Sequence, residues 1–108
     1  MRTSPKAAQL IAESLFQSPA GADYPGPAVE VPPLRSQMQG AVNMVFNLAN
    51  DEVGYLIPRT QWDVKAPYTY GRTSAPYGEV NSGGPRVAEA VHHEGLAALR
   101  RLHELLGE

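Results

Sequence analysis

Proline and glycine are the residues that most constrain how this chain can fold. The 108 residues include ten of each, concentrated between Ser18 and Gly84. Proline lacks the amide proton that helices and sheets use, and glycine loses more backbone entropy on folding than any other residue. The composition therefore predicts that much of the middle of the chain is ordered loop, around the single small core that this length allows.

The charge and the cysteine count exclude several classes of function. The formal net charge is −2, and no block of basic residues offers a nucleic-acid surface. Cysteine is absent, so disulfides, thiolate nucleophiles and Cys-ligated zinc are excluded together. No apolar run reaches membrane-spanning length, and polar residues interrupt the N-terminus too often for a signal-peptide core. We therefore expect a cytoplasmic protein.

Helices are predicted at both ends of the chain. Ser4 is a good N-cap and Pro5 suits the first helical position, which predicts a helix over Ser4–Gln17. A second helix is predicted over Pro85–Leu106, where apolar residues recur at helical spacing: Val87, Val91, Leu99, Leu102 and Leu106.

The middle of the chain predicts a strand and two short helical turns. The run Ala41–Leu48 is apolar and rich in β-branched residues, and polar residues follow it abruptly. This pattern is typical of a strand that ends in a polar loop. The turns are predicted over Leu34–Gly40 and over Arg59–Val64, where the second would present Trp62. The expected fold class is therefore α/β, with a small sheet centred on Val42–Leu48, flanked by the two terminal helices and joined by long loops.

The polar loop after the predicted strand, NDEVGY, holds the first candidates for chemistry. In one interpretation it is a tight turn, in which Asn50 and Asp51 bond to their own backbone and Gly54 takes a positive φ. In the other, Asp51, Glu52 and Tyr55 offer hard oxygen ligands or acceptors to a metal ion or a polar substrate. The residues alone leave both interpretations open.

A loop rich in tyrosine, Ala66–Gly84, lies further along the chain. Tyr68, Tyr70 and Tyr77 stand among prolines and glycines, and tyrosine supplies contact area at little rotamer cost. We expect this loop to be docked on the fold or to face a ligand. Ser82 and the two glycines after it could hold an anion or cap the helix that follows.

The three histidines do not form a recognisable metal motif. His92 and His93 are neighbours on a predicted helix and point in different directions, and His103 is too distant to join both. We interpret all three as partly solvated helix residues.

Several segments together resemble a known family. The stretches NLANDEVGYLIPRTQWD, PYTYG and PYGEVNSGGP, followed by a leucine-rich helix, resemble the later part of the catalytic domain of the neutral/alkaline non-lysosomal ceramidases, especially their bacterial ceramidase-like members. The upstream stretch GADYPGPAVEVPPLRSQM is similar to the linker that leads into that region. The resemblance divides the chain into an atypical N-terminal helix, residues 1–20, and a family-like segment, residues 21–108, of a partial domain.

The resemblance implies a zinc amidase that hydrolyses the N-acyl bond of ceramide or a related lipid amide. In this family two histidines, a glutamate and a tyrosine hold the zinc, and the tyrosine matches Tyr55. The resemblance also implies that Tyr77 and Glu79, with Glu52 from the polar loop, lie near the substrate. No catalytic residue of the family is carried onto this chain.

Departures from the family pattern imply that the chain is inactive alone. The zinc histidines and the proposed serine nucleophile belong to an earlier half of the domain that this sequence lacks. The family's P-G-E element is also missing, and Glu13 is the nearest carboxylate. Expected partners are therefore an N-terminal half of the same domain, a lipid amide substrate, or a second copy joined through an open sheet edge. The alternatives are a non-catalytic binding or structural module and a poorly folded relic.

Overall fold

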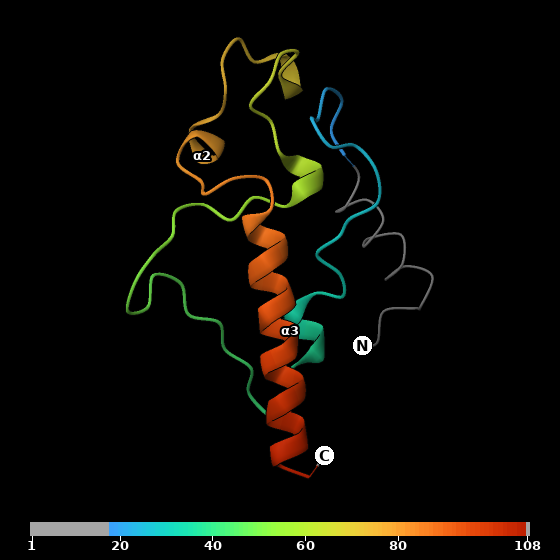
Figure 1. Cartoon of the computed structure of the whole chain (residues 1–108), viewed down its shortest axis with the longest axis vertical. Helices are drawn as coiled ribbons and strands as arrows, with labels where there is room; N and C mark the ends of the chain where they lie inside the picture. Colours follow the sequence, from blue (N-terminus) through green and yellow to red (C-terminus); the bar gives the residue numbers. More distant parts are fainter. Residues whose placement is uncertain (1–17, 108) are drawn as a thin grey trace.

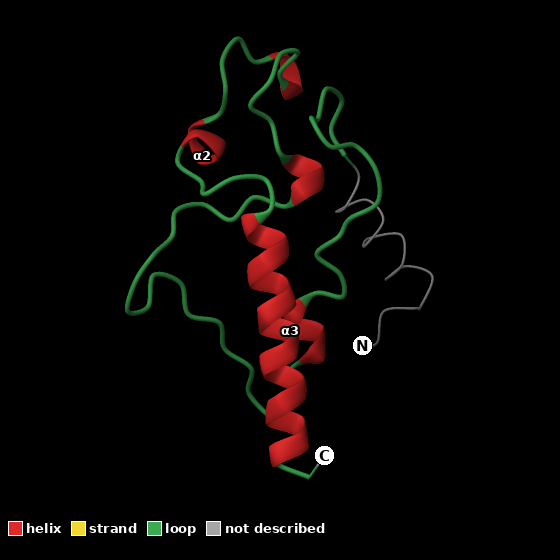
Figure 2. Cartoon of the chain, in the orientation of Figure 1, coloured by secondary structure: helices red, strands yellow, loops and turns green. Residues whose placement is uncertain are grey.

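The computed structural model describes residues 18–107, and this part of the chain consists of helices and loops (Figure 2). The elements in chain order are η1 (Leu34–Gln37), η2 (Arg59–Gln61), η3 (Thr69–Gly71), α2 (Tyr77–Val80) and α3 (Val87–Leu105), of which the three η elements are 3₁₀ turns. One long helix, α3, runs through the lower half of the view, with η1 beside it and η2, η3 and α2 beyond its N-terminal end (Figure 1). The helix predicted over Ser4–Gln17 lies outside the described residues.

The predicted C-terminal helix is confirmed as α3. Its end is closed by Gly107, which has a φ of 71° and donates its N–H to the Glu104 carbonyl at 3.2 Å. A left-handed glycine at this position satisfies carbonyls that the last helical turn would leave without partners. Glycine also serves the middle of α3, because a Cβ at Gly95 would lie 3.0 Å from a methyl group of Leu34. The first 3₁₀ turn, η1, therefore packs closely on α3.

The prediction of an α/β fold with a small sheet is wrong. Residues 18–107 contain no strand, and the segment Ala41–Leu48 runs as an irregular, exposed trace beside α3 (Figures 1 and 2). A strand is stabilised by its neighbours, and no described segment pairs with this one. The backbone also turns at Leu48, where φ is 52°. The sheet edge through which we expected two copies to associate is therefore not formed within the described part.

Trp62 is the larger of the two buried apolar residues in the described part. The helical turn before it is confirmed as η2, but the indole is buried, with 4% of its surface exposed, and is not presented to solvent. Among the described residues Ala88 is the other buried apolar residue, and four polar ones are buried with it: Thr60, Asp63, Thr69 and Glu79. The interior is therefore unusually polar.

The proline-rich linker before η1 is ordered by polar contacts with the Trp62 region. Asp23 donates its N–H to the Trp62 carbonyl at 3.1 Å and accepts the Val64 N–H through Oδ2 at 3.0 Å. Further along, Glu30 Oε1 accepts the Arg59 N–H at 2.9 Å. These bonds give partners to backbone groups that have no helix or sheet to satisfy them, which explains how loops of this length hold their shape.

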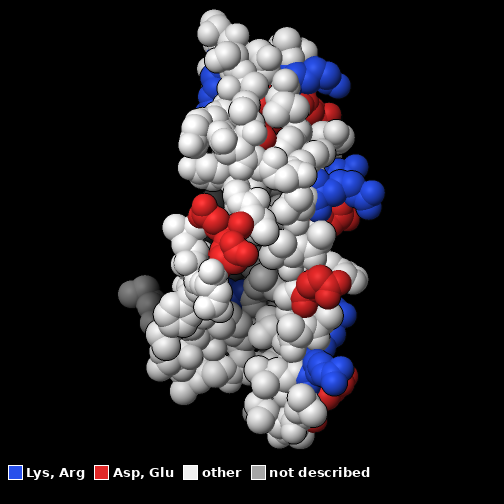
Figure 3. Space-filling model, turned by 60° about the vertical axis from the view of Figure 1, so that its left-hand side comes forward, with Lys and Arg blue, Asp and Glu red and all other residues white. Residues whose placement is uncertain are grey.

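The chain exposes more surface than a compact protein of its size. Its accessible area is 8388 Å², whereas a compact protein of this mass, 11.7 kDa, exposes about 5,900 Å². The radius of gyration is 16.2 Å, against about 13 Å for a compact domain of this length. In Figure 3, which brings the left side of Figure 1 forward, a broad part of the face carries no charged side chain. None of the described helices is long and apolar enough to cross a membrane.

Candidate functional site

The polar loop NDEVGY is shaped by its own residues. Asp51 Oδ1 accepts the Glu52 N–H at 2.8 Å, and the Asp51 N–H donates to the Ala49 carbonyl at 2.9 Å. Asn50 has a φ of 69° and Gly54 a φ of 84°, so the chain turns sharply twice. The interpretation of this loop as a tight turn is confirmed for Asp51 and Gly54. It leaves the carboxylates and the phenol on the surface, where a ligand can reach them.

Gly54 fixes the loop against the segment that follows α2. The Tyr55 N–H donates to the Asn81 carbonyl at 3.2 Å, and a Cβ at Gly54 would lie 2.3 Å from that same oxygen. A side chain at position 54 would therefore displace one segment from the other.

Replacing Gly54 with alanine is expected to separate the two segments. The new methyl group meets the Asn81 carbonyl, so the hydrogen bond from Tyr55 breaks and its amide exchanges faster in hydrogen-exchange NMR. Gly71→Ala is the matched control, because Gly71 also has a positive φ but a Cβ there meets nothing within 4 Å. Both variants carry the strain of a left-handed alanine, about 1–2 kcal/mol. Unchanged exchange of the Tyr55 amide in Gly54→Ala would contradict the close approach.

Three of the four predicted site residues lie close together. The rings of Tyr55 and Tyr77 meet edge to face, with centroids 5.8 Å apart and an interplanar angle of 80°. Gly78 also approaches Tyr55, because a Cβ there would lie 3.3 Å from Cδ1 of Ile57 and 3.8 Å from Cγ of Tyr55. Glu79 follows on the same turn of α2 and is buried. Tyr55 is 50% exposed, so its ring is anchored on one side and open to solvent on the other.

Glu52, the fourth predicted residue, is exposed on the loop that carries Tyr55. Both residues line an open hollow of about 580 Å³, which is formed by residues 46–48 and 51–56. Ligand sites commonly have volumes of about 300–1,000 Å³ and mix apolar walls with a few polar groups. The apolar side chains of Phe46 and Val53 and the carboxylates of Asp51 and Glu52 provide that mixture.

The described residues do not by themselves fit a zinc ion. Tyr55, Asp51 and Glu52 are hard oxygen donors, but zinc needs several donors that converge in defined geometry. Residues 18–107 contain no group of three or more His, Cys, Asp or Glu side chains that could hold a metal ion. Tyr55 is therefore at most one donor among the described residues, and a zinc site would need further donors beside it.

The histidines remain apart from this loop. All three lie on α3, with His92 and His103 half-buried and His93 exposed, which confirms their interpretation as partly solvated helix residues. His92 has a structural partner, since its Nε2 lies 2.7 Å from the Pro32 carbonyl and ties the linker to α3.

The turn before α3 is ordered by Ser82. Its Oγ accepts the Gly84 N–H at 3.4 Å, whereas the N-cap of α3 is Arg86. Ser82 therefore shapes the turn but does not cap the helix. Anion binding at this turn stays a prediction.

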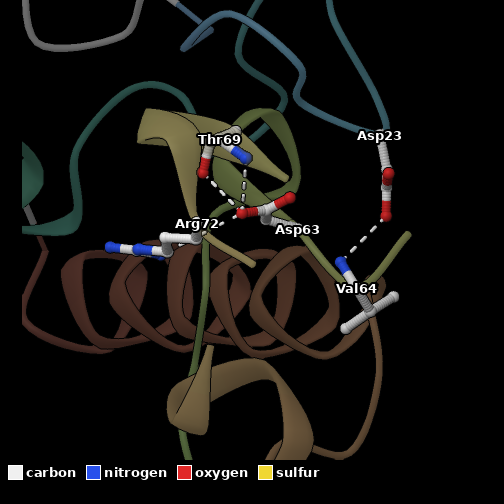
Figure 4. Close-up of polar contacts among 5 residues, drawn as sticks. All are labelled: Asp23, Asp63, Val64, Thr69 and Arg72. Carbon is white, nitrogen blue, oxygen red and sulfur yellow. Dashed lines mark hydrogen bonds and ion pairs between the residues drawn. The ribbon is translucent and has the colours of Figure 1, made fainter. Parts of the chain in front are cut away.

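Asp63 is a buried carboxylate that sequence reasoning missed. Its Oδ2 accepts the Thr69 N–H at 3.0 Å and the Thr69 hydroxyl, and Arg72 Nη1 lies 4.0 Å away (Figure 4). The other oxygen, Oδ1, is buried without a partner among the described atoms. Asp63 belongs to the stretch RTQWDV, which predicted a helical turn and an exposed Trp62, and its partners lie six and nine residues later in a loop. No sequence pattern signals such a contact.

A comparison with known proteins found no family model, no curated protein and no solved structure that matches this chain. The resemblance to ceramidases therefore depends on the residues quoted for it.

Proposed function

We propose that this chain supplies one wall of a two-part, ceramidase-like zinc amidase site that hydrolyses the N-acyl bond of ceramide or a related lipid amide. The observation that carries the proposal is the placement of Tyr55. Its backbone N–H is held by the Asn81 carbonyl and its ring contacts Tyr77 edge to face, yet half of the residue remains open beside an apolar-walled hollow. This arrangement suits a donor atom that must be held in place and still reach a ligand.

The roles follow from position and chemistry. Tyr55 would contribute one oxygen donor to a zinc ion, which would supply a Lewis acid for the amide carbonyl and for water. Tyr77 contacts the Tyr55 ring edge to face, and Glu79 lies buried two residues later on α2. Glu52 offers an exposed carboxylate to the polar headgroup of the substrate.

The remaining donors must come from a partner, which we propose is an N-terminal half of the same domain. The described part exposes large apolar side chains beside the hollow, among them Phe46, Leu48 and Val53, which are 66–78% exposed. Exposed apolar side chains that are this close together are typical of a surface that a partner covers. The chain by itself is inactive in this proposal, because one phenol cannot hold zinc.

Replacing Tyr55 with phenylalanine is expected to remove zinc from the assembled site. The experiment mixes this chain with the N-terminal half of a bacterial ceramidase-like protein that carries two histidines and the P-G-E element. Zinc binding is measured by competition with a chromogenic chelator, and hydrolysis with a fluorescent ceramide analogue. Loss of an outer-shell partner weakens metal binding by about 10–100-fold, and loss of a ligand should weaken it at least as much.

Tyr70→Phe is the matched control, because it removes the same hydroxyl from a tyrosine that is exposed and contacts Arg72 instead of the candidate site. It should leave zinc binding and hydrolysis unchanged. If the two halves associate and hydrolyse the substrate equally well with Tyr55→Phe, the assignment of Tyr55 is wrong. If they neither associate nor gain activity, the two-part site is wrong.

A non-catalytic lipid-binding module is the second candidate, and the hollow of residues 46–48 and 51–56 favours it. Its walls are largely apolar, which suits an acyl chain. The same fluorescent analogue separates the two functions. Saturable binding by the chain alone, with no hydrolysis in the presence of the N-terminal half and zinc, would support the module and contradict the amidase.

A further inference from the structure

The segment Ala41–Ala49 has a symmetric sequence. It reads AVNMVFNLA, and side chains of the same kind stand at equal distances on either side of Val45. The matched pairs are Ala41 with Ala49, Val42 with Leu48, Asn43 with Asn47, and Met44 with Phe46. A dimer with two-fold symmetry places each residue opposite the one at the mirrored position, so this pattern is complementary to itself.

The same segment is exposed and its backbone is unpaired. Val42, Met44, Val45, Phe46 and Leu48 are 59–78% exposed, although all are large and apolar. The backbone groups of residues 44–48 make no hydrogen bond within the described chain. Exposed apolar side chains combined with free N–H and C=O groups form a ready template for another extended chain.

We propose that two copies of the isolated chain associate through this segment, with residues 42–48 antiparallel and Val45 on the two-fold axis. Alternation then places Val42, Met44, Phe46 and Leu48 of both copies on one face of the two-chain ribbon. The asparagines lie opposite each other on the other face. Each copy supplies the neighbour that the segment lacks within its own chain.

Charge favours a second copy as the occupant. No charged residue occurs from Ala41 to Ala49, so the two-fold symmetry places no like charges opposite each other within this segment. The first acidic residue, Asp51, lies opposite Gln39 in this register. Like charges placed directly opposite each other would destabilise such a pair, and the sequence avoids them.

The segment itself offers apolar contact surface, since five of the seven residues from Val42 to Leu48 are large, apolar and at least 59% exposed. Pairing also changes the backbone conformation of Leu48, whose φ of 52° is disfavoured for leucine. In the paired segment the Leu48 backbone is extended and no longer strained.

Cysteine cross-linking tests the register directly, since the protein has no cysteine of its own. In Val45→Cys the two sulfurs meet at the axis, where Cα atoms of opposed residues are about 4.5–5.5 Å apart, within disulfide range. In the control Val42→Cys, position 42 of one copy lies six residues from its counterpart, about 20 Å away. We expect Val45→Cys to form a disulfide dimer under mild oxidation at least about tenfold faster than Val42→Cys.

A charge substitution tests association itself. Val45→Lys places two ammonium groups opposite each other, so sedimentation velocity should show a monomer. The matched control Val80→Lys changes an equally exposed valine on α2 and should remain a dimer like the unaltered chain. The helical signal in circular dichroism, to which the long helix α3 contributes, checks that each variant is folded.

Three results would overturn the proposal. Equal cross-linking of the two cysteine variants would show association without this register, and a dimer that survives Val45→Lys would place the interface elsewhere. An unaltered chain that is monomeric alone, but binds phosphatidylcholine vesicles or the N-terminal half through residues 42–48, would assign the segment to that occupant. Because these experiments use the chain alone and no zinc, their failure is distinguishable from failure of the proposed amidase.

Discussion

Replacing Trp62 with alanine is expected to destabilise the chain more than any other single truncation. Truncation of a buried aromatic residue costs about 3–5 kcal/mol, and native domains are stable by only about 5–15 kcal/mol. The indole is the largest buried apolar group among residues 18–107, so little remains to close the cavity. We expect the thermal melt of Trp62→Ala, followed by ellipticity at 222 nm, to lose most or all of its cooperative transition.

Trp62→Phe and Leu102→Ala serve as controls for that result. Phenylalanine keeps an aromatic ring in the site and should retain a cooperative transition at a lower temperature. Leu102 is half exposed on α3, and its truncation should cost much less. A midpoint for Trp62→Ala within about 2 °C of the unaltered chain would show that the core is not organised around the indole. A non-cooperative transition in the unaltered chain would instead support the poorly folded relic.

Replacing Asp63 with alanine is expected to have the second-largest effect. Thr69 is buried, and both its N–H and its hydroxyl would lose their acceptor. Each buried donor left without a partner costs about 1–3 kcal/mol, so we expect a loss of about 3 kcal/mol in the free energy of unfolding. Urea denaturation followed by tryptophan fluorescence measures this loss at Trp62, the adjacent residue.

Asp51→Ala is the control for Asp63→Ala, because Asp51 is exposed and bonds only its own loop. It should change stability by less than about 0.5 kcal/mol. Removing Arg72, which is 4.0 Å from the carboxylate and about half exposed, should cost no more than about 1 kcal/mol. Equal effects of Asp63→Ala and Asp51→Ala would mean that the buried carboxylate does not hold the loop.

The helical parts of the fold could be predicted because their signals are local. Apolar residues at helical spacing predicted α3, and the turn before Trp62 was predicted from a short run of six residues. The abundance of proline and glycine predicted that loops dominate the middle of the chain, as they do within the described part. In each case the residues that carry the signal also form the structure.

The strand could not be predicted reliably, because its existence depends on a neighbour. The run from Val42 to Leu48 is apolar except at Asn43 and Asn47 and contains two β-branched valines, a composition that is common in strands. A strand also needs a second segment for its hydrogen bonds, and residues 18–107 supply none. Sequence patterns describe what a segment can pair with but not whether the partner belongs to the same chain.

The candidate site was predicted in part. The resemblance to ceramidases named Tyr55, Tyr77 and Glu79, and the structure brings these three together without testing the chemistry assigned to them. Asp63 was missed because burial of a carboxylate depends on contacts across a loop. Apolar periodicity carries no information about such contacts.

The polar interior has a consequence for how this protein responds to temperature. Burial of apolar surface is the main source of the heat-capacity difference between folded and unfolded chains, and burial of polar groups opposes it. Because residues 18–107 bury two apolar residues and four polar ones, we expect that difference to be small for a chain of this length. The free energy of unfolding should then vary little with temperature, which calorimetry can measure.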